Sequence, residues 1–248
     1  MITIKNKEEI NKIREGGKKL AQVVHQVAGF VKPGISAMEL DVQADKLIKK
    51  SGGEPSFKGF NGYPAASCIS INEGLVHGIP SKNVIIQEGD IVSVDIGLKY
   101  KGLFTDMAVT VPAGRISKQA KSLILVTQKA LDIAVGSIKA GGTIGDIGFN
   151  VQRFIENNNY SVVRSLVGHG VGYKVHEDPR VPNFGQRGTG PVLKEGMVLA
   201  LEPMVNIGGP EVITKKDNWT IVTADGSLSA HFEHTVVITG KGAEILTK

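Results

Sequence analysis

The sequence repeats loosely at a spacing of 107 residues, and this repeat limits the possible folds more than any other feature. The offset places Ser36 on Thr143 and lays IVSVDIG (91–97) over VLALEPM (198–204). After a further 20-residue insertion, FTDMAVTV (104–111) matches HFEHTVVI (231–238). The same offset aligns residues of helices and turns, namely Lys32 with Lys139, Gly34 with Gly141, Glu39 with Asp146, Leu40 with Ile147, and Glu88-Gly89 with Glu195-Gly196. One offset that serves caps, turns and strands predicts two similar α/β halves, roughly residues 8–111 and 117–238, within a single domain 1–248.

Hydrophobic periodicity predicts how each half is built. Apolar residues recur at helical spacing over residues 8–30, and a second helix, 36–50, begins at Ser36 with Glu39 completing a capping box. Helices are expected again over 117–138 and 143–157, and strands over SCISI (67–71), VIIQEGDIVSVDIGL (84–98) and FTDMAVTV. With 41% apolar residues among 248, the chain can bury a substantial core.

Charge and cysteine content exclude several classes of protein. The net charge of +5 is dispersed over pairs such as Lys18-Lys19, which is typical of a solvated surface and not of a dedicated nucleic-acid site. No run approaches the roughly 18 apolar residues of a membrane span. The charged beginning lacks the apolar core of a secretory signal, so we expect a cytoplasmic protein, and the absence of a heptad pattern favours a monomer. Cys68 is the single cysteine, so any metal must be held by oxygen and imidazole ligands.

The repeat carries chemistry, because carboxylates occupy matching positions inside apolar strands. Asp95 matches Glu202, and Asp106 matches Glu233. An ionised side chain that faces a core costs several kcal/mol unless it is paired or bound to a metal. One such acid is usually a hydrogen-bonded structural group, but two symmetric pairs would repel one another unless cations lie between them. The pattern predicts a metal site on the pseudo-twofold axis, with carboxylates able to bridge two divalent ions.

Histidines supply candidate nitrogen ligands. His169 lies between two glycines in VGHGVGY, where an imidazole can approach the carboxylates closely, and it is the candidate ligand. His77 and His176 also lie among Gly and Pro turns, where side chains are often positioned for function. His25 is interpreted as a partly exposed helix residue, and His234 points to the strand face opposite Glu233. His231 shares the face of Glu233 and stays undecided between a structural and a functional role, with a structural role favoured.

These residues carry a family resemblance. The spacing of Asp95 and Asp106, followed by GHGVG, ALEPM and HFEHT and preceded by SINEGLVHGIP, resembles the methionine aminopeptidases of the M24 metallopeptidases, in the bacterial type I form. The resemblance runs from Lys7 to Leu246 and implies the α+β pita-bread fold, in which two pseudo-symmetric halves surround a curved antiparallel sheet. It also implies five ligands of a dinuclear metal centre, with Asp106 and Glu233 bridging: Asp95, Asp106, His169, Glu202 and Glu233. The donor set suits Mn, Fe, Co or Zn and does not choose among them.

The resemblance further implies an activity, removal of the N-terminal methionine from nascent proteins that carry a small second residue. A metal-bound water or hydroxide would attack the first peptide bond, and the free α-amine of the substrate would bind a metal. Glu202 would move the proton from the water to the leaving amine, while His77 and His176 would contact the substrate and stabilise the tetrahedral intermediate. Nascent chains as substrates imply transient contact with the ribosome.

A methionine side chain calls for an apolar and fairly deep pocket. By resemblance its walls include Phe60, Tyr63, Cys68, His77 and Trp219, with Phe57 and Val175 nearby. This sequence has Phe57, Phe60 and Val175 where the best-known bacterial pattern has cysteine, tyrosine and phenylalanine. These changes keep the pocket apolar and leave the tolerated second residue open.

Two alternatives explain the same residues. A proline-specific aminopeptidase or prolidase of the same fold would normally carry an additional N-terminal domain, and none fits before residue 8. A non-catalytic, peptide-binding member of the fold would normally have lost metal ligands, whereas all five candidates are present. The type II methionine aminopeptidases are disfavoured because their extra helical insertion has no room in 248 residues.

Overall fold

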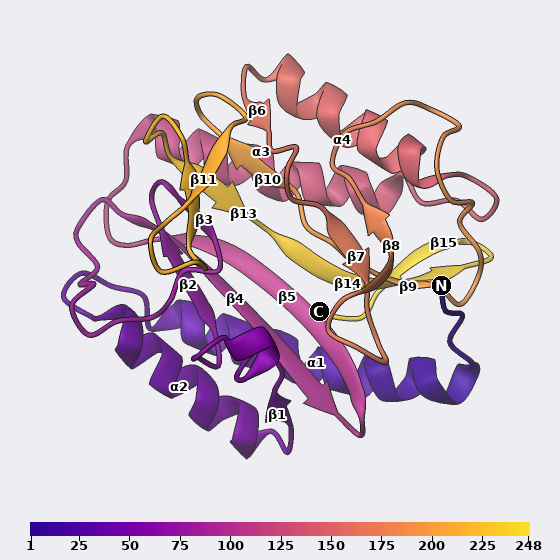
Figure 1. Cartoon of the computed structure of the whole chain (residues 1–248), viewed down its shortest axis with the longest axis horizontal. Coiled ribbons are helices and arrows are strands. Elements are labelled where there is room, and N and C mark those ends of the chain that lie inside the picture. The colour runs from indigo at the N-terminus through magenta and orange to yellow at the C-terminus, as the bar shows by residue number, and fades with distance from the viewer.

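The computed structural model describes residues 1–248, and a curved sheet of nine strands forms its centre (Figure 1). The strand order is β1-β4-β5-β14-β9-β7-β8, with β2 paired to β4 and β15 paired to β14. All of these pairings are antiparallel. The strands are β1 (Glu54–Pro55), β2 (Cys68–Ile71), β4 (Ile91–Tyr100), β5 (Leu103–Pro112), β7 (Gly168–Gly170), β8 (Glu177–Val181), β9 (Val198–Leu201), β14 (Glu233–Thr239) and β15 (Gly242–Ile245).

Two small sheets and one short helix complete the strand layer. One sheet has the order β13-β10-β6 and the other β11-β12-β3. A 3-10 turn, η1 (Phe60–Gly62), lies between β1 and β2. The strands of the small sheets are β3 (Gly74–Val76), β6 (Ser161–Val162), β10 (Met204–Asn206), β11 (Val212–Thr214), β12 (Ile221–Thr223) and β13 (Ser229–His231).

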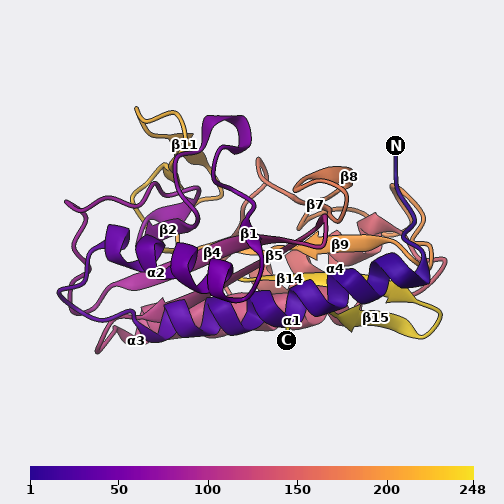
Figure 2. The same ribbon diagram turned by 90° about the horizontal axis from the view of Figure 1, so that it is seen from below.

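Four helices cover one face of the curved sheet, and loops and small sheets cover the other (Figure 2). They are α1 (Lys7–Gly29), α2 (Ala37–Lys50), α3 (Lys118–Gly136) and α4 (Ile144–Asn157), within two residues of the predicted bounds. Side chains alternate along the strands, so Val94 and Ile96 pack under α1 and α2 while Asp95 between them points to the opposite face. Leu201, Val236 and other residues of β9 and β14 pack against α3 and α4 in the same way. The apolar stripes of the helices therefore leave the other face of the sheet free for polar side chains.

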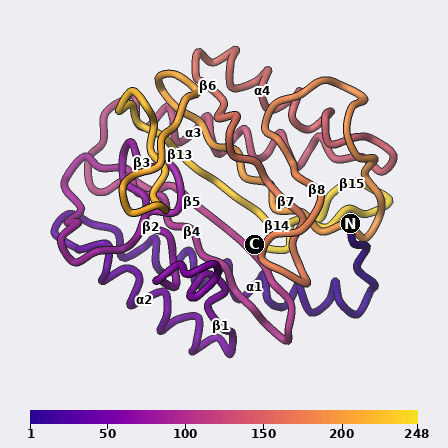
Figure 3. Tube along the Cα trace, viewed as in Figure 1, coloured from indigo at the N-terminus to yellow at the C-terminus, as the bar shows by residue number.

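The predicted repeat recurs in the local geometry. Ser36 and Thr143 cap α2 and α4 with capping boxes, and each forms an isolated antiparallel bridge, Ser36 with Ile85 and Thr143 with Val192. The bridge partners are again 107 residues apart. Gly34 and Gly141 both adopt positive φ, +90° and +83°, because the chain turns sharply into each helix. The first half and the second half of the chain occupy opposite sides of the molecule (Figure 3).

The two halves meet where β5 pairs with β14. Only two residue pairs form the backbone ladder there, Ala108 with Glu233 and Met107 with His234. On one side of the ladder the hydroxyl of Thr235 accepts from the Asp106 amide (2.9 Å) and donates to the Asp106 carbonyl (2.8 Å). On the other side the hydroxyl of Thr110 makes the same two bonds to the backbone of His231, at 2.9 and 2.8 Å. Threonine hydroxyls thus replace backbone partners at both ends of this junction, which we call the seam.

One strand prediction is wrong in part. Residues 84–90 were expected to continue the strand that includes Asp95, but β4 begins only at Ile91. The segment before it turns at Glu88-Gly89, where Gly89 has a φ of +97°. Its apolar residues pair and pack with the start of α2 instead, since the amides of Gly34 and Ala37 donate to the carbonyls of Ile86 and Val84.

Candidate metal centre

A row of side chains crosses the free face of the sheet and positions the acids. The antiparallel registers place Cys68 opposite Asp95, Asp95 opposite Ala108, and Ala108 opposite Glu233. Residues directly opposite each other in antiparallel strands point to the same face. Asp106 precedes Ala108 by two residues and therefore also points to this face. Three of the four predicted acids thus share one face across β4, β5 and β14, with small Ala108 between them.

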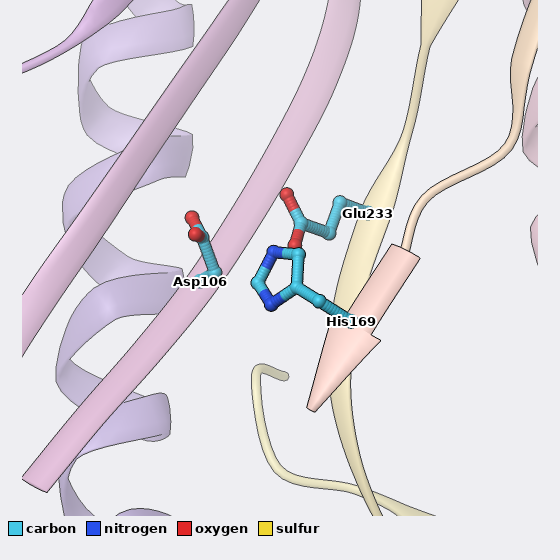
Figure 4. A group of neighbouring side chains, drawn as sticks. All are labelled: Asp106, His169 and Glu233. Atoms are coloured by element: carbon cyan, nitrogen blue, oxygen red, sulfur yellow. The ribbon is translucent and has the colours of Figure 1, made fainter. Parts of the chain in front are cut away.

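The second half of the chain brings His169 and Glu202 to the same place. His169 on β7 pairs with Ala200 on β9, and Glu202 directly follows β9. The Nε2 atom of His169 lies 3.5 Å from Oε1 of Glu202. Asp106, His169 and Glu233 each offer one atom to a group in which all atoms lie within 4.8 Å of one another (Figure 4). All five predicted ligands line one cavity of about 820 Å³.

The position of His169 prepares it to act as a ligand. Its Nδ1 lies 2.9 Å from the carbonyl of Gly170, which fixes the tautomer with the proton on Nδ1 and leaves the lone pair of Nε2 free. The glycines on either side are needed for packing, because a Cβ at Gly168 would lie 2.4 Å from the Ala200 carbonyl. At Gly170 it would lie 2.2 Å from the Asp178 carbonyl. The strand that carries His169 therefore has to be free of side chains on both sides of it.

Burial raises the pKa of every carboxyl group in the cluster. Asp95, Asp106 and Glu233 are 7%, 3% and 3% exposed. Burial raises the pKa of Asp106 to about 7, although the amide of Met107 donates to Oδ1 over 3.0 Å. Burial first, and then the charge of Asp106, raise the pKa of Asp95, Glu202 and Glu233 well above the usual range. Burial of these carboxyl groups therefore favours their protonated forms unless a cation compensates the charge.

The unsatisfied atoms of the cluster fit divalent cations. Oδ1 of Asp95 and Oε1 of Glu233 are buried and have no hydrogen-bond partner. Buried polar atoms are nearly always paired, so unpartnered oxygens that face other carboxylates indicate a missing positive charge. Burial also lowers the pKa of His169 to about 3, which keeps this imidazole neutral as a ligand must be. Four carboxylates and one neutral imidazole form a donor set suited to Mn, Fe, Co or Zn.

His77 and His176 line the same cavity as the acids. The ring centroid of His176 is 4.3 Å from that of His169 and 5.3 Å from that of Phe60, and both contacts are edge to face. His77 has a φ of +56°, an uncommon conformation for a residue other than glycine, and faces Trp219 with centroids 6.3 Å apart. Burial, and then His176, lower the pKa of His77 to about 4. Both histidines therefore present neutral N–H groups to the cavity.

An apolar cluster forms the wall of the cavity next to these histidines. The cavity is lined by Phe60, Tyr63, Cys68 and Trp219, the side chains that the resemblance assigns to a methionine pocket, and also by Phe57. Val175 packs in the same cluster without lining the cavity. The hydroxyl of Tyr63 lies 3.1 and 3.0 Å from the carbonyls of Ser67 and Gly78, so its polar end is occupied and its ring faces Trp219. The 20-residue insertion in the second half supplies Trp219, because its hairpin of β11 and β12 joins the first half through the pairing of β12 with β3.

The sequence left the role of one residue next to the acids, His231, undecided. His231 is 1% exposed, and its Nε2 lies 3.7 Å from Oε2 of Glu202 and 4.0 Å from Oε2 of Glu233. The available signal was its alternation with Glu233 in a segment expected to be one strand, which the structure divides between β13 and β14. Alternation alone does not distinguish a buried core histidine from one that contacts ligands. Met1, Thr3 and Tyr173 also line the cavity and were not predicted.

Comparison with known proteins identifies relatives over the whole chain. Residues 11–240 match the family described as metallopeptidase family M24. Methionine aminopeptidase 1 of Bacillus subtilis is 48% identical over 248 residues, which cover 100% of both chains. The crystal structure of a methionine aminopeptidase from Thermotoga maritima superposes with a TM-score of 0.98 at 47% identity and covers 100% of both chains.

Prolidases share the fold at a greater distance. The prolidase of Pyrococcus furiosus superposes with a TM-score of 0.80 at 27% identity, covering 99% of this chain and 65% of the prolidase. The fold common to these relatives is the pita-bread fold, so the predicted fold class is confirmed. The identity and the superposition are both higher for the methionine aminopeptidases than for this prolidase.

Proposed function

The chain belongs to metallopeptidase family M24, and on that basis we propose that it removes the N-terminal methionine from proteins. The observation that carries the proposal is the convergence of four acids, three of them buried, and His169 at the wall of a cavity that is also lined by apolar side chains. The acids and the imidazole suit peptide hydrolysis with a divalent metal. The apolar side chains suit an unbranched thioether side chain. The 48% identity to a methionine aminopeptidase supports the same conclusion.

We propose that two divalent cations would be held by Asp95, Asp106, His169, Glu202 and Glu233. When bound, the cations would polarise the scissile carbonyl and lower the pKa of a water molecule. Five ligands with several free oxygens are enough for two ions, and the unpartnered oxygens of Asp95 and Glu233 lie on the two outer strands of the acid row.

Glu202 is the proton carrier in this proposal. Its side chain is 13% exposed, more than those of the other acids, so it is the carboxylate that solvent reaches best. Asn183 donates to the backbone carbonyl of Glu202 over 2.9 Å and fixes the chain just after β9. Glu202 takes a proton from the attacking water and delivers it to the leaving amine, which is general acid-base chemistry.

His77 and His176 bind and orient the substrate. Because both are neutral, each can donate one N–H to the carbonyl oxygen or the amide of the peptide. Donors aimed at the oxygen that gains negative charge typically contribute 10²–10³-fold to the rate. The side chain of the substrate then lies among Phe60, Tyr63 and Trp219, with Cys68 at the base of the pocket.

The experiment that tests the proposal compares peptides and metals. The protein, treated with a chelator and then supplied with Mn²⁺ or Co²⁺, should release methionine from Met-Ala-Ser and leave Xaa-Pro dipeptides intact. Cleavage of the Xaa-Pro substrates alone would favour a prolidase-like function. Metal and peptide binding without release of methionine would indicate a non-catalytic peptide-binding member of the fold.

The natural substrates would be nascent chains with a small second residue, encountered in the cytoplasm, and we propose that the enzyme acts there as a monomer. No helix of the chain is long and apolar enough to cross a membrane. The net charge of +5 favours transient contact with the anionic ribosome. Co-sedimentation with ribosomes that weakens between 50 and 200 mM salt, in roughly the range where such contacts are screened, would support this, and its absence at low salt would contradict it.

A further inference from the structure

His231 differs from the other polar residues of the site in its surroundings. It is 1% exposed and does not line the cavity that the five candidate ligands line. Neither Nδ1 nor Nε2 has a hydrogen-bond partner. A buried polar side chain with two unpartnered nitrogens is rare and calls for an explanation at this position.

The backbone of His231 is fixed from two sides. β13 pairs with β10, which places His231 opposite Met204, two residues after Glu202. Across the seam, the hydroxyl of Thr110 accepts from the amide of His231 and donates to its carbonyl. Since the backbone cannot shift easily, the ring is held next to the acids, with Nε2 at 3.7 Å from the carboxylate of Glu202 and 4.0 Å from that of Glu233.

These distances are too long for hydrogen bonds in the metal-free protein and short enough for small movements to close them. The carboxylates that bind a metal are usually oriented by hydrogen bonds from outer residues. A buried ring that does not line the cavity can reach these carboxylates without occupying the space where a cation and substrate would lie.

We propose that His231 is a positioning residue that donates its Nε2–H to Glu202 and Glu233 and so orients two metal ligands of the second half. The proposal rests on the proposed function, because it assumes that these acids bind divalent metal. It differs from a direct role as a sixth ligand, for which the nitrogen would have to face the cavity with its lone pair free.

Substitution with leucine and with glutamine distinguishes these roles. His231→Leu removes the N–H at similar volume, whereas His231→Gln retains an amide N–H at similar reach but is a much weaker nitrogen ligand. His234→Leu serves as the matched control, because His234 lies next to Glu233 on the opposite face and its Nδ1 is 3.0 Å from the hydroxyl of Thr247. All variants are first compared with wild type by circular dichroism and urea unfolding without metal.

The readouts are the dissociation constants of Mn²⁺ and Co²⁺ by calorimetry and the visible absorption of bound Co²⁺. His231→Leu should weaken metal binding roughly 10- to 100-fold, the usual effect of losing such an outer partner. His231→Gln should restore the affinity to within a few-fold of wild type with an unchanged Co²⁺ spectrum, and His234→Leu should have no effect. In activity assays, His231→Leu should lower kcat much more than it changes KM for Met-Ala-Ser.

Each other outcome is decisive. Equal loss of affinity in His231→Leu and His231→Gln, with a changed Co²⁺ spectrum, would overturn the proposal in favour of direct ligation. Unchanged affinity in His231→Leu would overturn it in favour of a packing role. Failure of the wild-type protein to bind either metal would reject the proposed function itself, independently of His231.

Discussion

Asp106→Asn should stabilise the metal-free protein at neutral and alkaline pH, although it removes a proposed metal ligand. Asp106 lies at the seam with a pKa raised by burial from the ordinary 3.8 to about 7. The folded state therefore retains a proton that the unfolded chain has lost at neutral pH. The stability that this carboxyl group contributes is present below about pH 4 and is lost as the pH rises to about 7. Asparagine has nearly the same shape, carries no charge and can still accept the bond from Met107.

The size of the effect follows from the same pKa values. The difference between 3.8 and about 7 corresponds to about 4 kcal/mol of unfolding free energy at pH 8, at about 1.4 kcal/mol per pKa unit. Urea unfolding in the presence of a chelator at pH 5, 6, 7 and 8 measures it. The free energy of unfolding of the variant should exceed that of wild type by an amount that grows from pH 5 upward and levels off near pH 8.

Two comparisons make the test strict. Asp132→Asn on the exposed face of α3 should track wild type at every pH, because Asp132 is solvated. With saturating Mn²⁺ the order should reverse, because only wild type gains the full free energy of metal binding. A stability difference between Asp106→Asn and wild type that is the same at pH 5 and pH 8, or that favours wild type without metal, would refute the reasoning.

Three further predictions concern other parts of the molecule. Because the pKa values of the carboxyl groups of Asp95, Glu202 and Glu233 are raised, metal binding at pH 7 should release protons. Calorimetry should then give binding heats that differ between buffers of different ionisation enthalpy, and equal heats would contradict proton release. Lys5→Met should cost roughly 3–5 kcal/mol in urea unfolding, because it leaves the carboxylate of Glu177, 2.7 Å from the buried Lys5 Nζ, without its cationic partner and with only the Thr3 hydroxyl and two backbone amides donating to it. The additional change Glu177→Gln should recover part of the loss, and no recovery would argue against pairing as the cause. Burial raises the pKa of the Cys68 thiol, so iodoacetamide should label native protein at pH 8 far more slowly than unfolded protein. The labelled enzyme should turn over slowly while retaining its metal, as measured by elemental analysis. Fast labelling of native protein would contradict the buried position of Cys68.

The parts of the fold that the sequence predicted are those specified by local chemistry. Ser36 and Thr143 cap helices because their hydroxyls accept from the amide three residues on, and this signal is contained in four residues. Asp95 and Asp106 could be identified as candidates because acids are conspicuous in apolar strands. In contrast, the apolar residues 84–86 have the composition of a strand but pair with the segment that leads into α2, and no local pattern reveals that partner.

The role of His231 could not be predicted for a different reason. Its environment depends on β10, on Thr110 of β5 and on two acids from separate strands, and these come together only when the two halves meet. Trp219 was assigned to the pocket by the family resemblance alone, because it reaches the pocket only through the pairing of β12 with β3. Contacts between distant segments decide both positions, and one sequence contains little information about such contacts.

The seam has a consequence for how long the protein survives in a cell. Only two backbone pairs and two threonines join β5 to β14, and the acids on either side repel one another. Any ion bound between Asp106 and Glu233 would act as a cross-link between the halves as well as a catalyst. Molecules starved of metal would then be both inactive and easier for proteases to open, so metal shortage would lower the amount of enzyme and not only its activity. The amount of this protein that survives proteolysis would therefore depend on how much of it has bound metal.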